Sequence, residues 1–282
     1  MSPKVALIGA SAVIVPVLAY ADDGIEYHFG FLSAVNIGDV GEKEVESRIE
    51  SRLGKRAGSY NALSHKVEAE FVPWQDFRLS VATSVAYHDI VGVPGLDDRN
   101  WGAFNGISLG FRYRLLDREH APFGLAIEAE PQWSRVDGTS GAPVDQYGNQ
   151  LSVLVDKELI PNRIISVFNL VYEPEASRSR ITGAWSREST FRVAAAVMAQ
   201  PQPNFFAGAE ARYLRKYEGL ALDTFEGHAL YLGPTVSAKL GQYWLLAAWN
   251  IQVAGRSVEE PGRLDLKNFE RHQVRFKFGF SY

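Results

Sequence analysis

The sequence predicts an all-β protein, a closed antiparallel up-and-down transmembrane β-barrel of about twelve strands. Three observations predict this fold. Apolar residues recur at every second position in segment after segment, which is the period of a strand with two different faces. Short and long polar connections alternate along the chain. The strongest alternation, "HQVRFKFGFSY", comes at residues 272–282, where a final strand would be needed to close a barrel.

Residues 1–21 have the pattern of a secretory signal peptide. Lys4 gives a basic start, "VALIGASAVIVPVL" is an apolar run, and "AYA" places small residues before Asp22. The run is shorter than the roughly 20 residues of a spanning helix, and Pro16 weakens it further. We therefore expect cleavage after Ala21, with an uncleaved N-terminal anchor as the alternative. No later segment is a long apolar run, so no helical membrane span is expected.

Residues 22–42 precede the first predicted strand. Tyr27, Phe29 and Phe31 alternate with other residues in this segment. Such aromatic residues would suit a plug folded into the lumen of the barrel, or an extra strand. The sequence leaves both possibilities open.

The barrel itself is assigned to residues 43–282. The expected strands are 43–53, 62–72, 77–88, 103–115, 123–135, 150–159, 163–173, 184–199, 205–217, 228–240, 243–255 and 271–282. The first of them also spaces Val45, Ile49 and Leu53 as a helix would. We interpret it as a strand because the later segments form a regular series. Neither a linker nor an internal repeat divides the chain.

The connections indicate a chain that crosses one layer repeatedly. Short connections lie near "PWQ", "DREHAP", "LIPN", "QPQPN" and "GQ", and long polar ones near 54–61, 89–102, 136–149, 174–183, 218–227 and 256–270. Gly241 and Gln242 suit a two-residue turn with glycine leading. That turn would pair Leu240 with Tyr243 on the apolar face.

The apolar faces are expected to point outward, into lipid. A closed barrel of about twelve strands is too wide for side chains to fill as a dry core. Aromatic residues also gather at the strand ends, as in the two girdles of membrane barrels. They are Phe71, Trp74, Phe77, Phe123, Phe205, Tyr243 and Tyr282 toward the short turns, and Tyr87, Trp101, Trp133, Trp185 and Tyr213 toward the long loops. A closed barrel with a polar lumen leaves neither sheet edges nor charges in lipid.

The polar faces would then line the lumen with charges of both signs. The expected lumen-lining residues are Glu44, Glu46, Arg48, Glu50, Arg52, Glu68, Glu70, Arg78, Arg112, Arg114, Glu128, Glu130, Arg192, Glu210, Arg212, Arg275 and Lys277. Glu70 can face Arg78 across a short turn, and Arg112 and Arg114 lie opposite or diagonal to Glu128 and Glu130. Two interpretations stay open: a narrow charge-lined pore for small polar solutes, and a web of ion pairs that fills and stiffens the barrel.

The sequence also allows two enzyme hypotheses. A lipid-facing hydrolase needs a serine, a histidine base and an orienting polar group. His65, Ser47 and Ser51 share the apolar face and could meet diagonally, although the chain lacks the compact asparagine–histidine–serine pattern of outer-membrane phospholipases. Structural roles are the more common alternative.

A loop-rim protease of the omptin type would need acidic pairs and a His–Asp pair. His88, Asp89, Asp97 and Asp98 are the candidates, and turn formation is their alternative role. The same acids could bind a cation weakly, but no spacing predicts a metal site or any cofactor. Cysteine is absent, so thiolate sites are excluded, and the net charge of −4 argues against a nucleic-acid partner.

The stretch "VRFKFGFSY" resembles the C-terminal signature of Gram-negative outer-membrane β-barrels. Its residues Val274, Phe276, Phe278, Phe280 and Tyr282 correspond to the alternating apolar positions that end on an aromatic residue. The resemblance implies location in the cell outer membrane, with its lipid as partner, and insertion by the barrel-assembly machinery. The stretches "GPTVSAKLGQYWLLAAWNIQVAGR" and "NFERHQVRFKFGF" also resemble uncharacterised outer-membrane barrels of about this size, which implies no activity.

Together these observations favour a passive channel or transport barrel for small polar solutes. A closed-lumen barrel with a structural or loop-mediated interaction role is the second hypothesis, and a barrel enzyme is the third.

The C-terminal pattern leads to a first testable prediction. Changing Phe280 and Tyr282 to Asp, or removing Phe280–Tyr282, should abolish insertion, because the assembly machinery and the closing strand both need these apolar residues. Heat-modifiable, membrane-integrated protein should be measured by gel mobility. Wild-type amounts of it in either variant would contradict the prediction.

Overall fold

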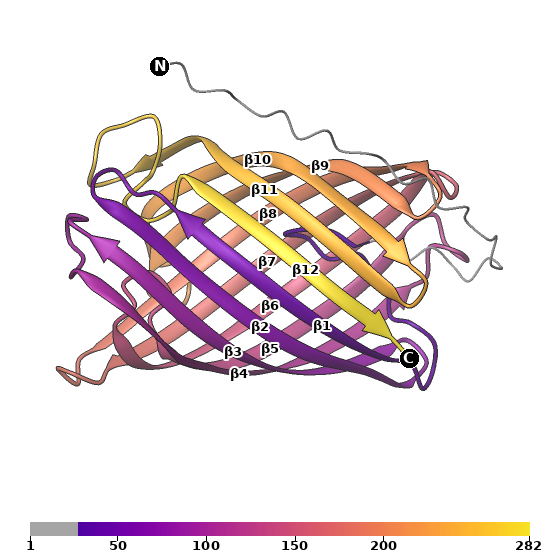
Figure 1. Ribbon diagram of the computed structural model, residues 1–282, viewed down its shortest axis with the longest axis horizontal. Helices are drawn as coiled ribbons and strands as arrows, with labels where there is room; N and C mark the ends of the chain where they lie inside the picture. Colours follow the sequence, from indigo (N-terminus) through magenta and orange to yellow (C-terminus); the bar gives the residue numbers. More distant parts are fainter. Residues whose placement is uncertain (1–27) are drawn as a thin grey trace, which may run out of the picture.

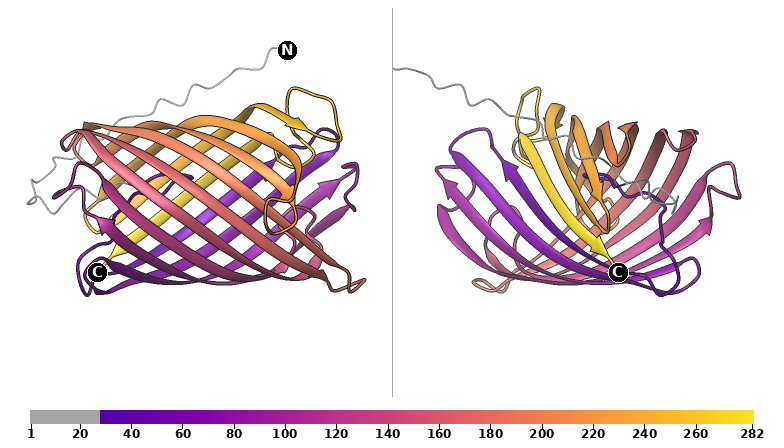
Figure 2. Two further views of the ribbon diagram at one scale, coloured as in Figure 1. Left: turned by 180° about the vertical axis from the view of Figure 1, so that it is seen from behind. Right: turned by 45° about the vertical axis from the view of Figure 1, so that its right-hand side comes forward.

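A computed structural model describes residues 28–282. The predicted signal peptide and residues 22–27 lie outside the described residues. Twelve antiparallel strands form one closed barrel, in which each strand pairs with its sequence neighbours and β1 pairs with β12 (Figures 1 and 2). The strands are β1 (Lys43–Leu53), β2 (Ser59–Trp74), β3 (Phe77–Val91), β4 (Arg99–Leu116), β5 (Gly124–Val136), β6 (Pro143–Ile160), β7 (Ile164–Ser179), β8 (Trp185–Gln202), β9 (Phe205–Glu218), β10 (Thr224–Leu240), β11 (Tyr243–Ser257) and β12 (His272–Ser281).

The barrel closes through its first and last strands. In the β1–β12 ladder, Val45 lies opposite Phe280 and Ile49 lies opposite Phe276. The pairing continues past the strand, because Tyr282 N donates to Lys43 O at 2.9 Å and Lys43 N donates to Tyr282 O at 3.2 Å. The expected role of the terminal alternation in closure is therefore confirmed.

Each predicted strand corresponds to an observed one, and 43–53 is a strand and not a helix. The predicted long loops were mostly wrong in extent. The expected loop 89–102 is only 92–98, for example, and 136–149 is only 137–142. Strands β4, β6 and β8 each have 18 residues, whereas about 9–11 residues cross a bilayer. Strand extensions with water on both faces carry no apolar alternation, so the sequence pattern misses them.

The tight turns confirm the expected hairpin parity. Gly241 has a φ of 64°, which a residue with a Cβ rarely adopts, and it leads the turn that pairs Leu240 with Tyr243. Lys239 pairs with Trp244 on the other face.

The barrel is inside-out relative to a water-soluble protein. Ile107, Leu109 and Ile127 are 51%, 48% and 46% exposed, whereas Glu210 and Arg212 are each only 2% exposed. The apolar face thus points outward and the charged face inward, as expected for a barrel that spans lipid. Among residues 28–282, no helix is long and apolar enough to cross a membrane.

A bulge in β4 overturns one expected girdle residue. The β3–β4 register shifts between Ser84 and Val85, which pair with Gly106 and Phe104 and leave Asn105 extra. In the part of β4 that precedes Asn105, toward the long loops, the extra residue exchanges which side chains point outward and which point inward. Phe104 is therefore 44% exposed, while Trp101 Nε1 donates to Gly141 O at 3.0 Å. Trp101 was predicted to belong to the aromatic girdle, and that prediction was wrong.

The outward facing generates a second prediction. Leu109→Arg should destabilise the folded barrel by about 2–4 kcal/mol, because it places a charge in lipid near mid-membrane. Tyr113→Arg, on the same face of β4 but nearer the short turn, is the matched control and should cost at most about 1 kcal/mol. Urea titration in lipid vesicles measures both, and equal effects would rule out the expected depth dependence.

Candidate functional site

The candidate site is the lumen, where residues 28–37 run across the half of the barrel nearest the short turns. Phe29, Phe31, Val35 and Ile37 of this segment are buried. The segment precedes β1 and lies inside the barrel (Figures 1 and 2). Within the described residues 28–42 it forms no strand, so the extra-strand alternative does not hold for that part.

One wall of the lumen binds amide groups of the segment. Glu210 on β9 accepts from Gly30 N at 2.7 Å and from Phe31 N at 3.1 Å. Asn169 on β7 accepts from Ser33 N at 2.8 Å and donates to Ser33 O at 2.9 Å. Asp156 on β6 accepts from Val35 N at 2.9 Å.

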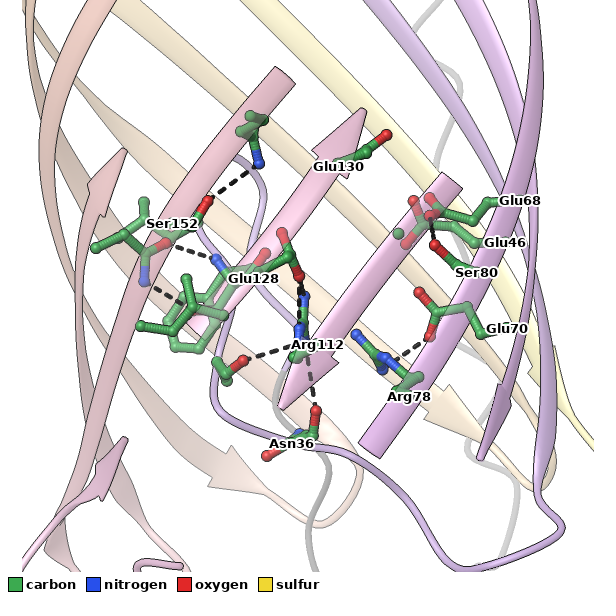
Figure 3. Close-up of a pocket in the computed structure, with 18 of the residues that line it drawn as sticks. Asn36, Glu46, Glu68, Glu70, Arg78, Ser80, Arg112, Glu128, Glu130 and Ser152 are labelled. Atoms are coloured by element: carbon green, nitrogen blue, oxygen red, sulfur yellow. Dashed lines mark hydrogen bonds and ion pairs between the residues drawn. The ribbon is translucent and has the colours of Figure 1, made fainter. Parts of the chain in front are cut away.

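Arginines bind its carbonyl oxygens. Arg275 on β12 donates to Gly30 O at 2.9 Å. Arg112 on β4 donates to Ala34 O and Asn36 O, each at 3.3 Å. The contact of Arg112 with Asn36 is drawn in Figure 3. The backbone of the segment is therefore bound by charged or amide side chains from five strands.

Aromatic contacts complete the packing of the segment. The ring of Phe31 lies between two guanidinium groups, 3.8 Å from that of Arg212 and 4.3 Å from that of Arg275. The ring of His28 stacks on Trp244 at 3.8 Å. Trp244 in turn lies across Gly279, where an added Cβ would be 2.4 Å from the indole. A glycine is thus required at position 279 of the closing strand.

Around the segment, inward-facing charges form ion pairs along the wall. Arg48 lies 3.0 Å from Glu46 and 2.9 Å from Glu68. Lys277 lies 3.2 Å from Glu46. Arg275 Nε donates to Glu50 at 2.9 Å. These contacts join β1, β2 and β12, so the ion pairs cross the seam at which the barrel closes.

The structure brings some predicted partners together and separates others. Arg78 lies 2.7 Å from Glu70, and Arg112 lies 2.5 Å from Glu128, as drawn in Figure 3. Arg114, however, pairs with Asp76 at 2.7 Å and with Asp117 at 3.1 Å. The β4–β5 register places Arg114 opposite Ala126 and diagonal to Glu128, as expected, but its guanidinium group binds the two aspartates instead of Glu128 or Glu130.

The remaining predicted lumen charges also face inward and are held by polar neighbours. Glu130 pairs with Lys66 at 2.5 Å, and Arg192 pairs with Glu173 at 2.9 Å. Arg212 donates to Asn250 and Gln273, Glu44 accepts from Trp244 and Ser281, and Arg52 donates to Gly138 O and lies 4.0 Å from Glu270.

Sequence reasoning missed several residues of this site. Asp156, Asn169 and Arg118 contact the segment, and Lys66 pairs with Glu130. Lys66 shares the inward parity of Glu68 and Glu70, and Asp156 shares that of Ser152. Strand parity could therefore have found Lys66, Asp156 and Asn169, but not Arg118, which lies in the turn between β4 and β5. Parity could not have shown which of these residues reach residues 28–37.

Two polar cavities remain beside the segment. One of about 150 Å³ is lined by the segment and by inward charges that include Arg112 and Glu128 (Figure 3). The other, of about 230 Å³, lies along β2–β7 and includes Lys66, Asn105 and Glu175. Arg48, Glu130 and Gln150 line both cavities.

The candidate lipid-facing serine and histidine do meet. Ser47 Oγ lies 2.9 Å from His65 Nε2 on the outer face. Among the described residues, His65 has no other hydrogen-bond partner, and Ser51 has none on its side chain. The pair satisfies two polar groups that would otherwise face lipid unpaired.

The candidate rim residues do not form a protease-like group. His88 is buried, and its Nε2 donates to Gly138 O at 3.1 Å inside the barrel. Asp89 accepts from Asn100 at 3.2 Å, and Asp98 accepts from Gly92 N at 2.7 Å. The expected alternative role in turns fits Asp98, whereas Asp89 lies on β3 and binds its partner across the β3–β4 ladder.

One further group has potential metal ligands. Asp117, Glu119 and His120, in the turn between β4 and β5, place their ligand atoms within 4.8 Å of one another. Asp117 already binds Arg114, and the other two residues are exposed.

At the opposite end, the loop 258–271 folds over the lumen. Gln252 Nε2 donates to Asp265 O at 3.1 Å and to Glu270 O at 3.3 Å, and Asp265 N donates to Gln252 at 2.7 Å. The Glu270 carboxylate lies 3.3 Å from Lys55. Burial alone would raise the pKa of Glu270, but the charges of Lys55 and Arg52 outweigh it and hold the pKa below the ordinary value.

This ion pair predicts how the loop 258–271 responds to pH. Since the pKa of Glu270 is lowered in the folded state, its stabilising contribution is present above the ordinary carboxyl pKa and is lost as the pH falls through the folded value. In Glu270→Gln, hydrogen exchange of the loop should be faster at pH 7 and should change less on acidification than in wild type. Glu260→Gln, on the exposed part of the loop, is the control. An unchanged exchange rate at pH 7 in Glu270→Gln would contradict the assignment.

Comparisons with solved structures agree on the fold. The chain is similar to the COG4313 outer membrane channel from Pseudomonas putida F1, with a TM-score of 0.63 and 7% identity, over 88% of this chain and 98% of that one. It is also similar to the β domain of the Bordetella autotransporter Brka, with a TM-score of 0.51 and 14% identity, over 86% and 100% of the two chains. The fold is therefore that of outer-membrane β-barrels.

No curated protein matches the sequence. Residues 20–282 match the model of the Family of unknown function (DUF6662), and the chain belongs to that family.

Proposed function

We propose that the protein is a transport barrel of the outer membrane that passes small polar solutes through its lumen. The two polar cavities that share Arg48, Glu130 and Gln150 carry this proposal. They lie side by side along the inward faces of neighbouring strands and are lined by charged and amide groups. A lumen that served only as a scaffold would have no need of adjoining polar spaces.

The size of the cavities limits the solute. Cavities of about 150 and 230 Å³ are at least as large as an engineered protein cavity of about 150 Å³ that holds one benzene molecule. With residues 28–37 in place, water, small ions and solutes of roughly that size fit, and larger solutes do not. A larger solute would therefore require the segment to move.

The junction of the two cavities is the expected constriction. Arg48 stands there between Glu46 and Glu68, and Glu130 binds both Lys66 and Ser108. Paired charges of both signs nearly cancel, so the native barrel should have weak ion selectivity.

A closed barrel with a structural or loop-mediated role is the second candidate. The same segment supports it, because residues 28–37 and the loop 258–271 each narrow one half of the lumen. The barrel-enzyme candidate has only the contact between Ser47 and His65, which lacks a third group among the described residues.

Conductance in a planar bilayer tests the proposal. The native protein should show small, steady conductance with weak selectivity. Glu128→Gln with Glu130→Gln removes the carboxylate partner of Arg112 and leaves Lys66 with Glu68 alone, so the lumen becomes more positive and selectivity should shift toward anions. Screening should reduce the shift at high salt.

Asp97→Asn with Glu119→Gln is the matched control, because it removes the same charge from exposed positions outside the lumen. It should leave selectivity unchanged. A correctly inserted barrel that passes no ions would favour the closed alternative. A double variant that conducts with native selectivity would show that Glu128 and Glu130 do not line the path.

A further inference from the structure

The contacts of residues 28–37 have an unusual distribution. Glu210 binds the adjacent amides of Gly30 and Phe31, where the chain bends, and Asn169 and Asp156 bind those of Ser33 and Val35, so that from Phe31 on every second amide is bound. Every second amide of an extended chain points to the same side, which is the spacing that a sheet edge or a peptide-binding groove recognises. The donors on this side of the segment therefore meet acceptors in the order of strands β9, β7 and β6.

The opposite side of the segment meets donors instead. Arg275 and Arg112 bind the carbonyl oxygens of Gly30, Ala34 and Asn36. The lumen thus holds a backbone that bends at Gly30 and Phe31, and again at Val35, between acceptors on one wall and guanidinium groups on the other. These hydrogen bonds are to groups that every peptide possesses, whereas Phe29, Leu32 and Ala34 also pack in a buried apolar cluster with residues such as Ile165 and Met198.

Two positions add side-chain specificity. A Cβ at Gly30 would lie 2.2 Å from Ala248 Cβ, so only glycine fits there. The next residue, Phe31, places its ring between Arg212 and Arg275. The groove therefore selects a glycine followed by an aromatic residue.

The segment joins β1 through a turn that can serve as a hinge. Gly38 and Gly41 have φ values of 91° and 92°, a region open to glycine at little cost. The turn is bound to the barrel by Gly41 N donating to Val72 O at 2.8 Å. Residues 28–37 could leave the groove by rotation at this turn without disturbing the β1 ladder.

We propose that this part of the lumen is a peptide-binding groove, occupied here by the chain's own residues 28–37, whose exchangeable ligand is a peptide that bends at a glycine–aromatic pair. The inference rests on the proposed transport function in one respect: passage of the bound peptide through the barrel. The peptide is then the class of solute that displaces residues 28–37. Binding itself can be measured without any conductance.

The test uses the full-length protein in detergent and a fluorescent peptide with the sequence of residues 28–35, His-Phe-Gly-Phe-Leu-Ser-Ala-Val. Gly30→Val should expel the native segment and expose the groove, whereas Ser33→Ala keeps the backbone contacts and is the matched control. Fluorescence anisotropy should show at least tenfold tighter binding to Gly30→Val than to wild type or Ser33→Ala. Phe31→Ala, which removes the ring held by Arg212 and Arg275, replaces Gly30→Val if that variant does not fold.

Two changes then test which groups recognise the peptide. N-methylation of the amides that correspond to Phe31 and Ser33 should weaken binding at least tenfold, while Ser33→Ala in the peptide should change it less than threefold. In the protein, Asn169→Ala combined with Gly30→Val should weaken binding, and Asn268→Ala in the same background should not, because Asn268 lies in the loop at the opposite end of the barrel, where it donates to Glu226 O and Asp265.

The proposed groove would be refuted if the peptide did not bind to Gly30→Val, or if the N-methylated and unmethylated peptides bound to it with equal affinity. Peptide binding in a barrel that conducts no ions would refute the transport function alone. Ion conductance without peptide binding would refute the groove alone.

Discussion

Lipid on the outer face of the sheet is the constraint on which the rest of the structure depends. The bilayer core offers no partner to a backbone amide or a charge, so every strand must be paired and every charge must point inward. The β1–β12 ladder pairs the two strands that would otherwise be edges, and the pairing continues to the carbonyl of Tyr282. Apolar residues such as Leu109 and Ile127 occupy the outward positions, which leaves the inward positions to the charges.

The inward charges then need partners of their own. The side chains of the strands alone do not fill a lumen of this width. Apolar residues of the N-terminal segment pack against Met198 and Trp244 in one part of it, and ion pairs such as those of Arg48 with Glu46 and Glu68 line the rest. Backbone amides serve as partners as well, because Glu210 accepts from two amides of the N-terminal segment and Asn169 accepts from one more. The segment and the wall thus satisfy each other's polar groups. As a result, residues 28–37 fill the half of the proposed pore nearest the short turns.

The same constraint explains the polar contact on the outside. Ser47 and His65 lie at diagonal positions of β1 and β2, where lipid provides no hydrogen bond. Their mutual contact removes the need for water. A serine and a histidine at bonding distance are thus compatible with a wholly structural role, and chemistry would require a third group and an oxyanion site.

The sequence by itself determined the number of strands, their order, the facing of their side chains and the turn at Gly241, because alternation with period two survives wherever one face meets lipid and the other meets polar groups. It could not locate the strand ends beyond the membrane, since both faces there are wet. The bulge at Asn105, which turns Trp101 inward, also leaves no mark in the pattern. Only the tertiary structure decided that Arg114 pairs with Asp76 and Asp117, that Glu130 pairs with Lys66, and that residues 28–37 lie against Glu210, Asn169 and Arg112. These contacts depend on which groups a long side chain reaches across a closed barrel and on the path of an irregular segment through it, and neither has a period that a sequence can display.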